Sequence, residues 1–242
     1  MNTYVTLAVV FAVIGIALQG IFIAVEHKEK YLPAVILKGS ASLMFVLVGV
    51  MAYSALISEE GMDTAGVKAL NTAFAGRLVT GLVFGLLGDV FLNLRFVFEK
   101  IGQKIFLVGI FFFLIGHILY LVALVPRTDS FLYCAIGGAV LAAALLVYIF
   151  KTMTVKTAFK IFGVVYLGAV FIMTFTAVWI AVAEGCTGAS LVYAIGAVLF
   201  TASDVVLIFN TFSGVTRFPL RITNLSLYYI GQLLIAGSLF WL

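Results

Sequence analysis

The architecture of this chain is decided by stretches such as residues 104–125, which read KIFLVGIFFFLIGHILYLVALV. After Lys104 this stretch contains no Asp, Glu, Lys or Arg, and a helix of about 20 apolar residues crosses the hydrocarbon core of a bilayer. The stretches of this kind that we expect to be transmembrane helices are residues 3–25, 33–57, 74–97, 104–125, 130–150, 157–183, 189–212 and 221–241. The sequence therefore predicts an all-α polytopic membrane protein, a bundle of about eight helices in which residues 1–242 form a single transmembrane domain.

The composition supports this prediction. Of the 242 residues, 64% are hydrophobic and 10% are charged, whereas a soluble domain carries about 25% charged residues. Such a chain lacks the polar surface needed to cover a globule in water, so lipid must be its solvent. The net charge of +4 is not accompanied by a run of basic residues or by a soluble nucleic-acid-binding domain, so we expect no nucleic-acid partner.

The distribution of Lys and Arg predicts the orientation, because basic loops face the cytoplasm. Only Lys68, Arg77 and Arg127 lie at the even-numbered loops. The odd-numbered loops hold Lys28, Lys30, Arg95, Lys100, Lys104, Lys151, Lys156, Lys160, Arg217 and Arg221. We therefore expect a cell-membrane protein with both termini outside. Residues 3–25 are predicted to be a retained helix, because no basic segment and no cleavage site mark a signal peptide.

Two acidic residues, Asp89 and Asp204, lie deep in apolar segments. An ionisable group inside a membrane is costly, so each is a candidate functional residue. Asp89 lies six residues before Arg95, and Asp204 lies six residues before Asn210. At about 1.5 Å per residue, both carboxyl groups should lie roughly 10 Å inside the cytoplasmic boundary. Two carboxyl groups at one depth are expected to share a cavity.

A weak internal repeat accompanies the aspartates. The segments Leu87–Leu92 and Ala202–Leu207 align at an offset of 115 residues, and the same offset aligns Ile115–Leu119 with Ile230–Leu234. We therefore expect the third and fourth helices to be related to the seventh and eighth. Parallel repeats often place a binding site at their interface.

Further polar residues occur at helical spacing and are expected to face the interior of the bundle. Each such residue is also compatible with a simple hydrogen bond between helices. The stripes are Lys38 with Ser42; Gly81, Gly85, Asp89 and Asn93; His117 with Tyr120; Tyr166 with Thr174; and Asn224, Tyr228 and Gln232. Two acids and one histidine form a weak ligand set, so we expect no metal and no cofactor. Cys134 and Cys186 have no disulfide pattern and are interpreted as small apolar residues.

The sequence resembles the YhhN-like family of membrane proteins, whose animal members include lysoplasmalogenase. The motifs that carry the resemblance are Gly88-Asp89-Val90-Phe91-Leu92, Gly116-His117-x-x-Tyr120, Ser203-Asp204 with Leu207, and Tyr228-Tyr229-x-x-Gln232-Leu233-Leu234. The resemblance implies hydrolysis of the vinyl ether bond of lysoplasmalogen, with a lysophospholipid as substrate and membrane lipid as the surroundings. Where the family often has Lys-Pro in the second helix, this chain has Lys38-Gly39.

The residues suit that chemistry. Hydrolysis of a vinyl ether needs an acid that protonates the β-carbon and a carboxylate that stabilises the resulting cation. Neighbouring carboxyl groups in an apolar site favour one shared proton, so Asp89 and Asp204 are the predicted catalytic pair. We expect Asp89→Asn and Asp204→Asn each to abolish turnover in a protein that still folds. Supporting or substrate-binding roles are predicted for Lys38, Asn93, His117, Tyr120, Ser203, Tyr228 and Gln232.

Other interpretations remain open at this stage. Lys38 could extend to the interface, pair with an aspartate or bind a lipid phosphate. The phosphate could equally lie near Arg95, Lys100, Arg217 or Arg221. Paired acids also occur in proton-coupled transporters, which is the main alternative function. An intramembrane aspartyl protease fits less well, because the first Gly of its Gly-x-Gly-Asp motif is absent before Gly88-Asp89. A non-enzymatic lipid-binding protein would not need two buried acids at one depth.

Overall fold

The computed structural model describes residues 3–58, 65–213 and 217–242. Within these residues the regular structure is helical, and eight helices are long and apolar enough to cross a membrane. They are α1 (Thr3–His27), α2 (Tyr31–Ser58), α3 (Ala65–Val97), α4 (Gly102–Leu124), α5 (Phe131–Thr152), α6 (Thr157–Ala183), α7 (Gly188–Phe212) and α8 (Phe218–Gly237). The predicted class of fold is confirmed, and short 3₁₀ turns occupy Glu99–Ile101, Val125–Arg127 and Ser238–Trp241.

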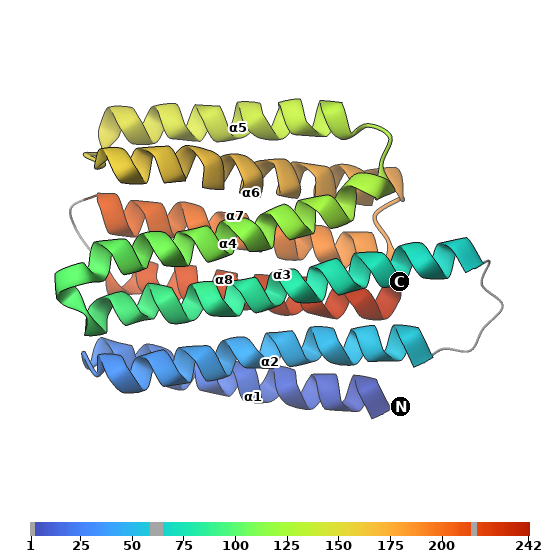
Figure 1. Cartoon of the computed structure of the whole chain (residues 1–242), viewed down its shortest axis with the longest axis horizontal. Coiled ribbons are helices and arrows are strands. Elements are labelled where there is room, and N and C mark those ends of the chain that lie inside the picture. Colours follow the sequence, from blue (N-terminus) through green and yellow to red (C-terminus); the bar gives the residue numbers. More distant parts are fainter. Residues whose placement is uncertain (1–2, 59–64, 214–216) are drawn as a thin grey trace.

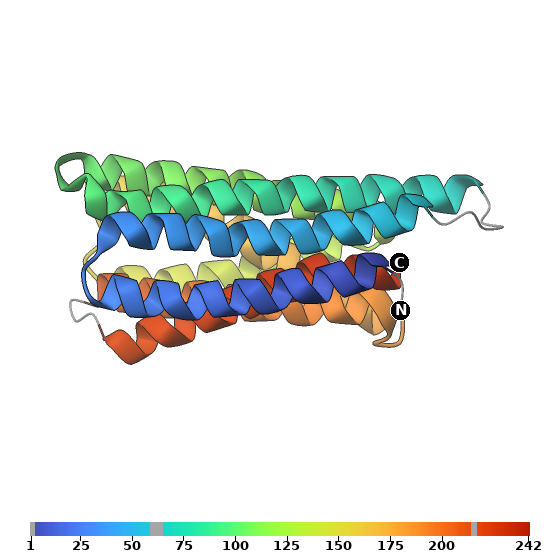
Figure 2. The same ribbon diagram turned by 90° about the horizontal axis from the view of Figure 1, so that it is seen from below.

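The largest difference from the predicted boundaries is at α3. This helix begins at Ala65, whereas the sequence placed its start at residue 74. The prediction followed the hydrocarbon-sized apolar run, but a helix satisfies its own backbone hydrogen bonds and continues beyond that run. Residues 65–68 of the predicted Glu59–Lys68 connection are therefore helical, and residues 59–64 lie outside the described part of the chain. The start of α3 projects beyond the neighbouring helices (Figures 1 and 2).

The eighth helix also differs at both ends from the predicted residues 221–241. It begins at Phe218, with Pro219 in its first turn, where a missing backbone N–H is no loss. The α-helix ends at Gly237, and residues Ser238–Trp241 form a 3₁₀ turn.

The helices run along a common axis, and both termini lie at the same end of the bundle (Figure 1). We call this the terminal end. At the opposite end, here called the basic end, α1, α3, α5 and α7 end and α2, α4, α6 and α8 begin. The chain-adjacent pairs α1–α2, α3–α4, α5–α6 and α7–α8 pack together, while α4 also packs on α6 and α8 on α2. The helices α1 and α5 form opposite edges of the bundle (Figure 1).

Two helix pairs approach closely at glycines. A methyl group at Gly116 of α4 would lie 3.0 Å from the carbonyl oxygen of Gly81 in α3, and one at Gly231 of α8 would lie 2.8 Å from that of Gly196 in α7. Small residues allow such contact in lipid, where no hydrophobic force drives helices together. Because Gly196 and Gly231 follow Gly81 and Gly116 by 115 residues, the offset of the predicted repeat, we propose that the two helix pairs are related.

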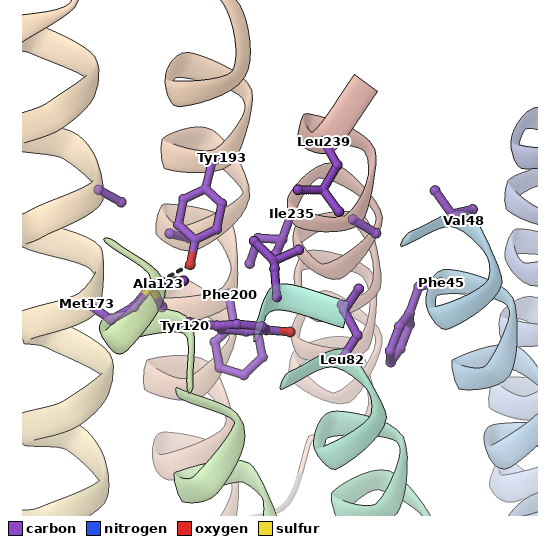
Figure 3. Packing of buried hydrophobic residues seen from close by; sticks show 14 of the residues in the cluster. Phe45, Val48, Leu82, Tyr120, Ala123, Met173, Tyr193, Phe200, Ile235 and Leu239 are labelled. Atoms are coloured by element: carbon purple, nitrogen blue, oxygen red, sulfur yellow. Dashed lines mark hydrogen bonds between the residues drawn. The ribbon is translucent and has the colours of Figure 1, made fainter. Parts of the chain in front are cut away.

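A packed apolar core occupies the centre of the bundle and continues toward the terminal end. Phe45, Leu82, Tyr120, Phe200 and Ile235, from five helices, meet there with exposed fractions of 1% or less (Figure 3). Leu82 precedes Asp89 on α3 and Phe200 precedes Asp204 on α7, and both helices run toward the basic end, so this core lies on the terminal side of the two aspartates. The core therefore fills the bundle on the terminal side of the carboxyl groups.

Candidate functional site

A cavity lies between α3, α4, α6, α7 and α8 in the half of the bundle nearer the basic end. About 990 Å³ of space between atoms belongs to it, a figure that includes the open mouth. Most of its wall is apolar, formed by Leu92, Phe106, Ile110, Phe113, Phe159, Leu167, Phe200, Leu207, Ile208 and Phe212. An apolar wall suits a hydrocarbon chain.

Asp89 and Asp204 both line this cavity. Asp89 lies eight residues before the last residue of α3, Val97, and Asp204 lies eight residues before the last residue of α7, Phe212. At about 1.5 Å per residue, each carboxyl group is roughly 12 Å from the basic end of its helix. Only 4% of Asp89 and 5% of Asp204 is exposed. The structure thus brings two buried acids to one depth in one cavity.

The carboxyl group of Asp89 is held by three donors. Lys38 Nζ lies 3.5 Å from Oδ1, while the hydroxyls of Ser42 and Tyr228 donate to Oδ2 at 2.5 and 2.6 Å. An ammonium group and two hydroxyl donors are the environment that suits an ionised carboxylate. The side chain of Asp89 is therefore equipped to carry a negative charge inside the bundle.

Lys38 is fixed from the other side as well. Its Nζ donates to Gln19 Oε1 at 3.3 Å, and it lies 4.4 Å from the centre of the Tyr228 ring. Only 1% of the residue is exposed, so the predicted alternative in which Lys38 extends to the interface is wrong. Of the three alternatives, the structure has the one in which Lys38 pairs with an aspartate.

Asp204 has a different environment. Tyr166 of α6 donates a hydrogen bond to its Oδ2 at 2.7 Å, and no other described residue forms a hydrogen bond or ion pair with its carboxyl group. No hydrogen bond joins Asp89 and Asp204 among the described residues, and each acid has its own donors. The two carboxyl groups are thus chemically distinct, which the sequence did not indicate.

Two of the other predicted residues reach the cavity. Tyr228 and Asn93 both line it. Tyr228 donates to the carboxyl group of Asp89, whereas Asn93 Nδ2 donates to the backbone oxygen of Asp89 at 2.9 Å. This bond joins two residues of α3 that are one helical turn apart. Asn93 thus adds a polar group to the wall without touching the carboxyl group of Asp89.

The remaining predicted residues are buried behind the wall. Tyr120 donates to Gln232 Oε1 at 3.2 Å, and the Ser203 hydroxyl donates to the Phe200 backbone oxygen within its own helix. None of these polar side chains lines the cavity. They connect helices or satisfy backbone groups, as the alternative interpretation of such stripes expected.

His117 also lies behind the cavity. Its Nδ1 is 2.7 Å from the backbone oxygen of Phe113, while the buried Nε2 has no hydrogen-bond partner in the part of the chain that the structure describes. The ring meets the edge of Tyr166, with ring centres 5.6 Å apart. Through this contact His117 positions the phenol that donates to Asp204, and it does not itself reach the space where a ligand would bind.

Several site residues were absent from the predicted set. Ser42 and Tyr166 were noticed for their helical spacing, but spacing alone could not show that each donates to an aspartate. Gln19 was not among the predicted residues, although an isolated amide in a strongly apolar helix is a usable signal. Its Nε2 donates to the Leu225 backbone oxygen at 3.4 Å, so Gln19 links α1, Lys38 and α8.

The described residues hold no group of three or more His, Cys, Asp or Glu side chains arranged for a metal ion. Cys134 is buried, Cys186 is exposed, and both are free thiols. The polar part of the cavity therefore consists of carboxyl, hydroxyl, amide and cationic groups.

Fold and site together define a multi-pass helical membrane protein with a buried, acid-lined cavity at one end of its bundle. The family model described as the YhhN family matches residues 40–239, and the chain belongs to this family. The resemblance noted in the sequence is thereby confirmed. The matched region contains both aspartates and begins after Gln19 and Lys38. No curated protein and no solved structure matches the chain.

Proposed function

We propose that this protein is an ether hydrolase that cleaves the vinyl ether bond of lysoplasmalogen and releases a fatty aldehyde and a glycerophospho-alcohol. The observation that carries the proposal is a largely apolar cavity whose wall holds two carboxyl groups with different donors. Membership of the YhhN family is consistent with this activity. The substrate would reach the cavity from the membrane itself.

The different donors suggest different roles for the two acids. Asp89, with the Lys38 ammonium and two hydroxyls, is suited to remain a carboxylate and stabilise a cation. Within residues 3–58, 65–213 and 217–242, Asp204 accepts a hydrogen bond from one phenol and pairs with no cation, so it is suited to hold the proton that is transferred. Enzymes separate the roles of two carboxyl groups through such differences in environment.

The reaction then follows in balanced steps. Asp204 gives its proton to the β-carbon of the vinyl ether, and the double-bond electrons leave an oxocarbenium ion on the α-carbon and ether oxygen. Water attacks the α-carbon and returns a proton to the Asp204 carboxylate, which forms a hemiacetal. Collapse of the hemiacetal breaks the bond to the glycerol oxygen, which takes up the hydroxyl proton. One water is consumed, and Asp204 ends protonated.

A proton-coupled transporter is the alternative that the paired acids allow. Transporter sites are typically built where helices are interrupted near the midplane. Here α3 and α7 continue without a break through Asp89 and Asp204. This continuity favours the hydrolase.

The orientation of the bundle decides which leaflet supplies the substrate. The excess of Lys and Arg at the basic end supports placing that end in the cytoplasm. We therefore propose a cell-membrane protein with both termini outside and its cavity open toward the cytoplasmic leaflet.

The test is hydrolysis of a 1-alkenyl lysophospholipid by purified protein in D₂O, with the 1-alkyl ether analogue as the control substrate. We expect an aldehyde that carries one deuterium on the carbon next to the carbonyl, because the β-carbon takes its proton from the acid. Asp204→Asn should release no aldehyde. Cleavage at the phosphate, or uptake of the lipid into sealed vesicles without any product, would refute the proposal.

A further inference from the structure

Three cationic side chains line the cavity, and two of them already have a carboxylate partner. Lys38 pairs with Asp89. Arg221 binds Glu26 through two contacts, with Nε 3.0 Å from Oε2 and a second nitrogen on Oε1. Arg95 of α3 has no acidic partner within 4.0 Å among residues 3–58, 65–213 and 217–242. Of the cations on the wall, Arg95 is therefore the one whose charge the described residues leave unneutralised.

The guanidinium of Arg95 is positioned by aromatic rings. Its central carbon lies 4.6 Å from the centre of the Phe96 ring and 4.3 Å from that of Phe106. Stacking on rings holds the plane of the group and leaves its N–H edges free. Its buried Nε has no hydrogen-bond partner among the described residues, although buried donors are nearly always satisfied. Arg95 thus presents unused donors at a fixed place.

That place is the mouth of the cavity. A shallower hollow at the basic end shares Arg95, Phe106 and Phe159 with the deep cavity and continues to Glu99 and Gln103 beside the α3–α4 connection. Arg95 therefore stands where the carboxylate-lined interior opens toward the basic end of the bundle.

We propose that Arg95 is the anion site of this protein and binds the phosphate of a single-chain phospholipid whose glycerol points toward the aspartates. Planar guanidinium groups bind phosphate through two parallel hydrogen bonds. The identity of the lipid as a lysoplasmalogen rests on the function proposed above, whereas the phosphate contact does not.

The spacing between the aspartates and Arg95 agrees with the length of the lipid between its vinyl ether and its phosphorus. Arg95 follows Asp89 by six residues on α3, so their backbone positions are about 9 Å apart along the helix axis, and Asp204 lies at the same depth on α7. In a lysoplasmalogen, seven covalent bonds separate the β-carbon of the vinyl ether from the phosphorus, an extended length of roughly 9 Å. A phosphate on Arg95 thus allows the vinyl ether to reach the carboxyl groups. The hydrocarbon chain would lie against the apolar wall.

Binding should be measured on the Asp204→Asn background with two non-hydrolysable ligands, a 1-alkyl lysophospholipid and the 1-alkylglycerol that lacks its phosphate. We expect Arg95→Gln to weaken binding of the phospholipid about tenfold or more, since hydrogen bonds to a charged group are among the stronger ones. Binding of the alkylglycerol should not change. Arg95→Lys should retain part of the phospholipid preference, because it keeps the charge and loses the two-bond geometry.

The control variant is Lys104→Gln, which removes an exposed charge at the same end of the bundle and should leave both dissociation constants unchanged. Equal weakening of both ligands by Arg95→Gln, or no weakening at all, would overturn the proposal. If Arg95→Gln does not fold, unchanged phospholipid preference in Arg95→Lys would overturn it in the same way. If glycerophosphoethanolamine binds as tightly as the lipid, the ligand of Arg95 is a free phosphate ester and the proposal of a lipid ligand is overturned. The two proposals can also fail separately. If Arg95→Gln loses the phospholipid preference but the wild type releases no aldehyde, the anion site stands and the hydrolase is refuted.

Discussion

The two aspartates should differ sharply in what their removal does to stability. The sequence alone suggested that Asp89→Asn and Asp204→Asn would both fold, and the structure changes this expectation for Asp89. In Asp89→Asn the Lys38 ammonium, 1% exposed, loses its only carboxylate partner among the described residues. Removing one member of a buried ion pair costs about 3–5 kcal/mol.

Asp204→Asn removes no counter-charge. The amide oxygen of the new side chain can accept the Tyr166 hydrogen bond that now ends on Oδ2. Exchange of one hydrogen bond for another costs about 1 kcal/mol or less. We therefore expect Asp89→Asn to lower the free energy of unfolding by roughly 2–4 kcal/mol more than Asp204→Asn, while both variants fail to release aldehyde.

The double variant Lys38→Met/Asp89→Asn isolates the cause. It removes both charges and keeps acceptors for Ser42 and Tyr228, so it should regain most of the stability lost in Asp89→Asn and remain inactive. Unfolding of each variant would be followed by circular dichroism as SDS is titrated into mixed micelles. The reasoning fails if the two single variants are equally stable, or if the double variant is no more stable than Asp89→Asn.

The other predictions concern the cavity, the glycine contacts and the orientation. Gly163 lines the cavity with nothing within 4 Å of an added methyl group, so Gly163→Leu should fold but lower kcat/KM by roughly tenfold to a hundredfold by displacing the lipid; unchanged kinetics would mean that the substrate binds elsewhere. Gly231→Ala should destabilise the bundle by about 1–3 kcal/mol, because the methyl group would meet a backbone oxygen at 2.8 Å. At Gly168, where an added methyl group meets nothing, alanine should be neutral or stabilise by up to about 1 kcal/mol, and equal effects at Gly231 and Gly168 would contradict the close approach of α7 and α8. On intact cells a membrane-impermeant maleimide should label the exposed Cys186 but not the buried Cys134, whereas labelling that requires permeabilised cells would reverse the orientation and move the cavity to the outer leaflet.

The sequence by itself determined the class of fold and the depth of the two acids. Long apolar runs such as residues 104–125 leave a helix as the only way to satisfy the backbone in lipid. Asp89 and Asp204 stand out because ionisable groups are costly there. Both facts depend on local composition and on distance along one helix, which a sequence shows directly.

The tertiary structure decided what surrounds each acid. The donors to Asp89 come from α2 and α8, and the donor to Asp204 comes from α6. Helical spacing shows which residues share a face but not which helix that face meets, because lipid-solvated helices carry weak hydrophobic asymmetry to direct their packing. For the same reason Lys38 and Arg95 could not be told apart as phosphate candidates. Only the packed bundle shows that Lys38 is already paired with Asp89, while Arg95 stands at the cavity mouth without an acidic partner in the described part of the chain.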